Sequence, residues 1–74
     1  MKTVQISLNS IDKVKAFVND ITKFDYDFDL VSGRYVIDAK SIMGIFSLDL
    51  SNPLQLQIED WKEEYASVIE KYLH

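Results

Sequence analysis

The residues best suited to chemistry lie where the chain is expected to pass from one regular element to the next. Asn9, Ser10 and Asp12 stand at the first such junction, between an alternating segment and a helical one. A helix start presents free backbone N–H groups that attract anions, so a hydroxyl or carboxylate there could accept a phosphoryl group. The same side chains also cap helices. No phosphate-pairing arginine is nearby, which favours capping.

Ser41 presents the same two alternatives at a later junction. A phosphate on this residue would meet the positive end of a helix dipole, which favours negative charge. A serine at this position also satisfies free N–H groups as a helix cap. We favour the capping interpretation and keep phosphorylation as a hypothesis.

No metal or cofactor site is predicted. Asp25, Asp27 and Asp29 alternate as in the opening of a calcium loop, but the glycine and glutamate that complete such a loop are missing. The solvent face of a strand explains this alternation better. The chain has no cysteine, and its one histidine, His74, is the last residue, where we expect a frayed end. We therefore expect a protein that is not an enzyme.

Composition bounds the remaining classes. Apolar residues make up 47% of the 74 residues and charged residues 27%, which is typical of a globular chain, and we expect one domain over residues 1–74. The net charge of −4 disfavours nucleic-acid binding, which depends on phosphate contacts. No secretory signal and no apolar run of about 20 residues is present, so we expect neither export nor membrane insertion. With no cysteine, a cytoplasmic location fits best.

Hydrophobic periodicity predicts the element order β-α-β-β-α-β-α. The expected strands cover about residues 2–8, 26–30, 35–37 and 54–58, and the expected helices about 11–21, 38–48 and 61–72. A sheet with one apolar face must be covered by helices, so the pattern indicates an α+β two-layer sandwich.

Two local patterns refine the helices. Asp60 and Glu63 form a capping-box-like start for the third helix, whose buried face would carry Trp61 and Tyr65. Gly44 lies inside the second helix, where glycine costs about 1 kcal/mol relative to alanine, so it indicates close packing.

The run from Lys40 to Leu48 closely resembles the second-helix signature of HPr, the histidine-containing phosphocarrier of the bacterial sugar phosphotransferase system. In this chain it reads Lys-Ser-Ile-Met-Gly-Ile-Phe-Ser-Leu. The resemblance implies an HPr-like open-faced sandwich, in which an antiparallel four-stranded sheet of order 1-4-2-3 is covered on one side by three helices. It also implies that Ser41 matches the serine that a dedicated kinase phosphorylates in many family members.

The motif that carries phosphoryl chemistry in this family is missing. Family members have Gly-(Ile/Leu)-His-Ala-Arg-Pro between the first strand and the first helix, whereas residues 8–14 here read Leu-Asn-Ser-Ile-Asp-Lys-Val. Both the carrier histidine and its arginine are absent, and Lys13 lacks the guanidinium fork that pairs with phosphate. The leading hypothesis is therefore an HPr-like protein without phosphocarrier activity that acts as a protein-binding or regulatory module.

A docking surface is predicted on the second helix. Ile42, Met43 and Phe46 match the apolar patch through which phosphocarriers dock on Enzyme I and on regulatory partners. A helix with one face on the sheet cannot bury these three residues together with Ile45 and Leu48, and exposed apolar patches mark interfaces. The alternative is that a small domain buries nearly all five in its core.

Two further functions stay open at this point. A divergent phosphotransferase-system component could still take part in phosphoryl relay through Ser10, Asp12 or a partner's histidine. A homodimeric structural protein could instead use the Ile42 and Phe46 patch on a second copy of itself. The expected partners are thus proteins, with no nucleic acid, membrane insertion or metal.

Overall fold

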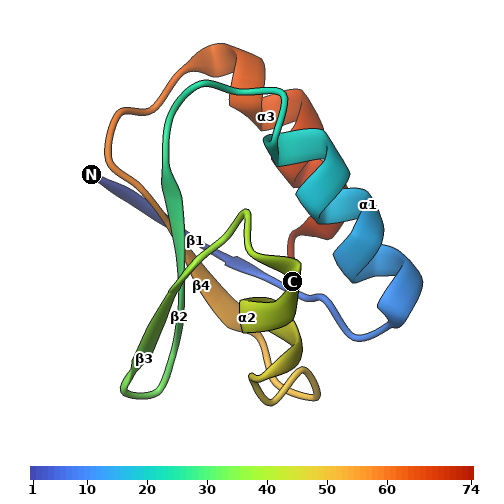
Figure 1. The fold of residues 1–74 in the computed structure, drawn as a ribbon. Coiled ribbons are helices and arrows are strands. Elements are labelled where there is room, and N and C mark those ends of the chain that lie inside the picture. Colours follow the sequence, from blue (N-terminus) through green and yellow to red (C-terminus); the bar gives the residue numbers. More distant parts are fainter.

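The computed structural model describes all 74 residues and confirms the predicted order of elements. Figure 1 shows four strands with three α-helices gathered on one side of the sheet. In chain order the elements are β1 (Lys2–Ile6), α1 (Ile11–Ile21), β2 (Phe28–Ser32), β3 (Tyr35–Asp38), α2 (Ile42–Phe46), β4 (Leu54–Ile58), α3 (Glu63–Ile69) and a closing 3-10 turn (Glu70–Tyr72).

The sheet is antiparallel throughout, and its strand order is β1-β4-β2-β3, as expected from the resemblance. Its register aligns one apolar row across all four strands, made by Val4, Leu56, Leu30 and Ile37. Because side chains alternate between the two faces of a sheet, this row faces the helices. The α+β open-faced sandwich predicted from the sequence is therefore confirmed.

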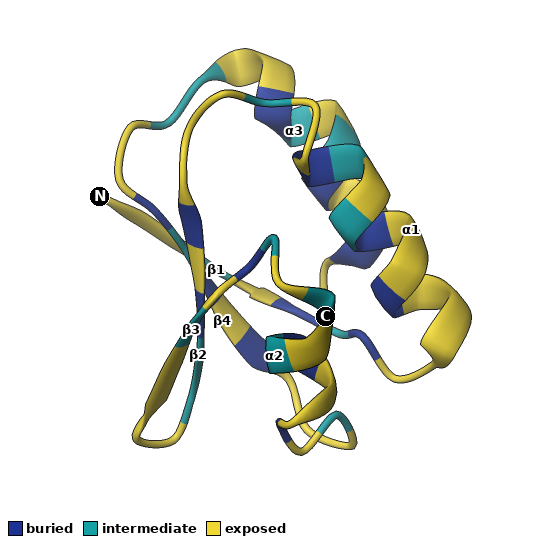
Figure 2. Ribbon diagram, viewed as in Figure 1, coloured by how far each residue is buried: buried dark blue, intermediate teal, exposed yellow.

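The core lies between the sheet and the helices. Sixteen buried residues form one cluster, and none of them carries a charged side chain. Figure 2 shows the buried positions on the inner sides of α1 and α3 and along the central strands. Helix α1 contributes Val14, Phe17 and Ile21 at helical spacing, as its periodicity predicts.

The predicted boundaries of two helices are wrong. Helix α2 begins at Ile42 rather than near Asp38, because Asp38 ends β3 and its carbonyl accepts a hydrogen bond from the Ser41 N–H at 2.9 Å. The Asp38 carboxylate also accepts from the Lys40 N–H at 2.9 Å, which fixes a turn before the helix.

The predicted capping box of α3 is also wrong. Lys62 occupies the cap position without a side-chain hydrogen bond, and Asp60 lies in the bend ahead of the helix. Trp61 consequently precedes α3 instead of sharing its buried face. Its ring still packs edge-on against Tyr65, with 6.0 Å between ring centroids.

The carboxyl end is held against β1, so the expectation of a frayed end at His74 is wrong for the backbone. The Ser7 N–H donates to the Tyr72 carbonyl at 2.8 Å, and the His74 N–H donates to the Gln5 carbonyl at 3.1 Å. These bonds enclose an antiparallel bridge between Ile6 and Leu73.

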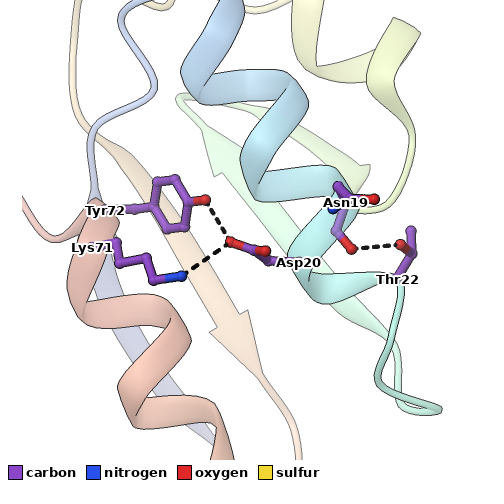
Figure 3. Close-up of polar contacts among 5 residues, drawn as sticks. All are labelled: Asn19, Asp20, Thr22, Lys71 and Tyr72. Atoms are coloured by element: carbon purple, nitrogen blue, oxygen red, sulfur yellow. Dashed lines mark hydrogen bonds and ion pairs between the residues drawn. The ribbon is translucent and has the colours of Figure 1, made fainter.

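A side-chain contact ties the same segment to α1. Figure 3 shows the Tyr72 hydroxyl donating to the Asp20 carboxylate at 2.7 Å, with Lys71 Nζ 3.8 Å from the same oxygen. The Tyr72 ring packs edge-on against Phe17, with ring centroids 5.3 Å apart. The last turn of the chain thus packs against α1 as well as β1.

The Tyr72 contact predicts a stability change at high pH. Burial and, next, the hydrogen bond to Asp20 raise the pKa of Tyr72 above its ordinary value of 10.0. Above that pH the unfolded state loses the phenolic proton while the folded state keeps it, so the free energy of unfolding should fall as pH rises. The Tyr72→Phe variant should lose about 1.5–3 kcal/mol near neutral pH, since the bond is to a charged group, and should show a shallower alkaline decline.

Urea unfolding at a series of pH values measures both effects. The control is Tyr35→Phe, which removes the hydroxyl of a tyrosine that is 65% exposed and should leave the pH profile of the parent protein unchanged. An alkaline decline of equal slope in Tyr72→Phe and the parent would contradict the assignment.

Candidate functional site

The junction between β1 and α1 is built as a helix cap. Ser10 has extended backbone angles, and its hydroxyl accepts a hydrogen bond from the Lys13 N–H at 3.1 Å. Asp12 lies exposed in the first turn of α1. The one arginine, Arg34, lies in the turn between β2 and β3, and β3 and β1 are at opposite edges of the sheet. The geometry supplies no guanidinium to a phosphoryl group at this junction.

Ser41 caps α2 in the same manner. Its hydroxyl accepts from the Gly44 N–H at 3.2 Å, and the residue is exposed. The capping role expected from the sequence is thus present. Phosphorylation of this exposed hydroxyl stays a prediction.

Gly44 explains how closely α2 approaches the sheet. A Cβ added to Gly44 would lie 3.3 Å from Ile37 Cδ1 of β3 and 3.2 Å from the Ser41 hydroxyl. Both contacts are tighter than most side chains make, so glycine lets α2 sit directly on β3. This is the close packing that a glycine inside a helix indicates.

The five apolar residues expected around α2 divide between core and surface. Ile45 and Leu48 are buried, whereas Met43 is 77% exposed and Phe46 is 39% exposed. Ile42 is partly buried and packs against the core cluster. The second helix therefore presents Met43 and Phe46, with the edge of Ile42, to solvent.

Ile11 is an exposed apolar residue at the start of the first helix. It lies in the first turn of α1 and is 61% exposed. Its position at helical spacing from Val14 gave no sign of this exposure. The first turn of α1 thus contributes no buried residue, and the helix enters the core from Val14 onward.

Lys40 has a structural role that its sequence context did not reveal. Its Nζ donates to the Phe24 carbonyl at 2.6 Å and lies 5.9 Å from the centroid of the Phe28 ring. This contact joins the segment before α2 to the loop after α1, sixteen residues earlier in the chain. The lysine thereby supplies a hydrogen-bond donor to the Phe24 carbonyl, which lies beyond the end of α1.

The alternating aspartates are split by the start of β2. Asp29 lies on the exposed face of β2, as the strand interpretation predicts, but Asp25 and Asp27 precede the strand. These two line an open depression of about 340 Å³ together with Tyr26, Glu59 and Asp60. No group of three or more histidine, cysteine, aspartate or glutamate side chains is placed to hold a metal ion.

The comparisons with known proteins identify the family. No family model matches this chain, and no curated protein matches it. Among solved structures, the crystal structure of HPr-C-His from Thermoanaerobacter tengcongensis is 30% identical to it, with a TM-score of 0.76 over 96% of this chain and 93% of that one. The chain belongs to the HPr-like family of phosphocarrier proteins.

A second member gives the same result. The phosphocarrier protein HPr from Bacillus anthracis str. Ames is 27% identical to this HPr-like chain, with a TM-score of 0.65, covering 99% of this chain and 94% of that one. The likeness extends over the whole HPr-like sandwich and is not confined to residues 40–48. In this chain, no helix has the length and apolar character needed to cross a bilayer.

The contact between Lys40 and Phe24 generates a local prediction. Replacing Lys40 with methionine keeps much of the side-chain volume but removes the charged donor from the Phe24 carbonyl. Because hydrogen bonds to charged groups contribute about 1.5–3 kcal/mol, we expect Lys40→Met to lower the free energy of unfolding by an amount in that range. Amide hydrogen exchange over residues 22–27 should accelerate at the same time.

The matched control is Lys23→Met, since Lys23 is exposed and makes no side-chain hydrogen bond. It should change neither the unfolding free energy nor the exchange of the loop. If both variants behave alike, the contact has no specific role.

Proposed function

We propose that this HPr-like chain is a protein-binding or regulatory module that does not carry a phosphoryl group itself. The observation that supports this most directly is the junction between β1 and α1. A phosphocarrier needs a nitrogen nucleophile that is partly neutral near pH 7, and here the position before the helix is occupied by Ser10, whose hydroxyl caps the helix. The proposal places one domain over residues 1–74 in the cytoplasm.

The partner surface in this proposal is the exposed side of α2. Met43 and Phe46 are exposed in a protein that buries sixteen residues in its core. Methionine adapts its shape to a partner, and an exposed aromatic side chain contributes a large apolar area to an interface. The partner we propose is a protein component of the phosphotransferase system, in keeping with the phosphocarriers that this chain resembles.

Ser41 offers a means of regulation. Its exposed hydroxyl lies in the residue before Ile42, so a phosphate there would bring about two negative charges next to the apolar side chains of α2. A charge that must be desolvated on binding weakens an apolar interface. In this proposal phosphorylation of Ser41 releases the partner.

The α2 surface can be tested with a double substitution. Met43→Asp with Phe46→Ser should lower affinity for purified Enzyme I at least tenfold, because it places a charge and a small polar group where apolar contact is required. Both residues are exposed, so the unfolding curve should change little. Calorimetric titration measures the affinity.

The control for this variant is Tyr26→Ser, which removes an aromatic side chain that is 46% exposed in the loop before β2. It should bind Enzyme I as the parent does. Equal affinity of the parent and the Met43→Asp, Phe46→Ser variant would contradict docking through α2.

Phosphoryl transfer can be tested directly. After incubation with phosphoenolpyruvate and Enzyme I, the intact mass of this chain should show no added phosphoryl group, whereas an HPr with its histidine should be modified in the same mixture. Mass analysis under neutral conditions preserves labile acyl and nitrogen-linked phosphates. Modification at Ser10 or Asp12 would contradict the proposal and support the relay alternative.

A further inference from the structure

The two edges of the sheet are treated differently. At the β1 edge, Leu73 and His74 pair with the end of the strand, and Lys2 lies at its beginning with Nζ 4.6 Å from the centroid of the Trp61 ring. Edge lysines and covering segments are common protections against strand-to-strand association. The β3 edge has neither, since Tyr35–Asp38 contains no lysine and no proline and no strand pairs with its outer side.

The free side of β3 carries unpaired backbone groups. The Ala39 N–H donates to the Phe28 carbonyl at 2.8 Å, and Leu30 and Tyr35 face Ile37 and Ser32 across the hairpin. Hydrogen bonding alternates along an antiparallel pair, so the odd-numbered residues of β3 bond to β2. The N–H and C=O groups of Val36 consequently point away from the sheet, and so does the Asp38 N–H.

Two side chains of this edge strand, Tyr35 and Val36, are apolar and exposed. Tyr35 is 65% exposed and Val36 is 61% exposed, on opposite faces of the strand. Figure 2 shows the outer strand of the hairpin as exposed along most of its length. An exposed apolar edge strand is a template for pairing with another strand.

The charges at the two ends of β3 are complementary to each other. Arg34 comes just before the strand and makes no ion pair, since the one ion pair in the structure joins Lys71 and Asp20. Asp38 ends the strand and lies directly opposite Asp29 of β2. Like charges opposite each other destabilise a sheet. No cation pairs with Asp29 or Asp38, so a positive charge brought to this end of β3 would stabilise it.

We propose that a second copy of this chain pairs with it through β3, antiparallel, about a two-fold axis at Val36. In this register Val36 lies opposite Val36 of the second copy, and Tyr35 lies opposite Ile37, a pairing of aromatic and β-branched side chains that stabilises sheets. Arg34 lies opposite Asp38 and supplies the cation that the Asp29 and Asp38 pair lacks. The sheet then continues through both copies.

The interface is short, so the dimer is weak and depends on concentration. Four residues of strand with their neighbours bury less than the roughly 1,200 Å² of stable complexes. The pairing uses β3 and not the α2 surface, so its failure and the failure of partner docking are separate outcomes. Its charged ends make it weaker at high salt.

The test is a pair of charge variants. Arg34→Glu and Asp38→Arg each place like charges opposite each other when the variant pairs with itself, and opposite charges when the two variants pair together. Sedimentation equilibrium should show dimerisation of the parent, at least tenfold weaker dimerisation of each variant alone, and recovery in their equimolar mixture. Circular dichroism of each variant checks the fold.

Asp38 also accepts hydrogen bonds in the turn before α2, so the Asp38→Arg variant could fail to fold. A second variant, Val36→Lys, keeps the test decisive in that case. Val36→Lys places two lysines opposite each other at the two-fold axis while both charged ends stay intact, and it should be monomeric. A parent that is monomeric up to about 1 mM overturns the proposal. So does a parent whose dimer is unaffected by Val36→Lys, or one lost only in the Met43→Asp, Phe46→Ser variant.

Discussion

The apolar row that crosses the sheet from Val4 through Leu56 and Leu30 to Ile37 is the constraint on which the arrangement of the helices depends. A sheet face of this kind is stable only when helices cover it, and the chain supplies one helix after β1, one after β3 and one after β4. Each helix contributes its apolar side chains to a single cluster without buried polar residues. The apolar side chains on the surface are those that this cluster does not include.

The position of α2 shows how the row controls the candidate interface. Ile37 is the outermost member of the row, and α2 lies close against it at Gly44, where a Cβ would come within 3.3 Å of Ile37 Cδ1. Helix α2 has only five residues. With Gly44 against the sheet, its Ile45 side chain is buried and its Met43 side chain is exposed. The exposure of the candidate docking residues is therefore a consequence of a backbone contact on the opposite side of the same helix.

Periodicity predicted the elements well wherever one face is buried. The spacing of Val14, Phe17 and Ile21 and the alternation of Leu54, Leu56 and Ile58 both report burial, because burial is what selects their apolar types. It failed at boundaries, where hydrogen bonds decide. Asp38 ends β3 through bonds to the turn that follows, and no hydrophobic pattern contains that information.

The candidate site was predictable in part for the same reason. That residues 8–14 contain no histidine is visible in the sequence, and the capping roles of Ser10 and Ser41 follow from residue type at a helix start. The tie from Lys40 to the Phe24 carbonyl joins residues distant in sequence, so only the fold reveals it. The strand order likewise came from the family and not from the residues, since pairing partners leave no periodic signal.

The pairing of the last residues with β1 bears on how this protein is made. β1 is complete only when β4 lies along one side of it and residues 72–74 bond to the other. Synthesis proceeds at about 5–20 residues per second, so β1 is made before either of its partners. β1 therefore lacks its pairing partners until residues 54–58 and 72–74 have been synthesised.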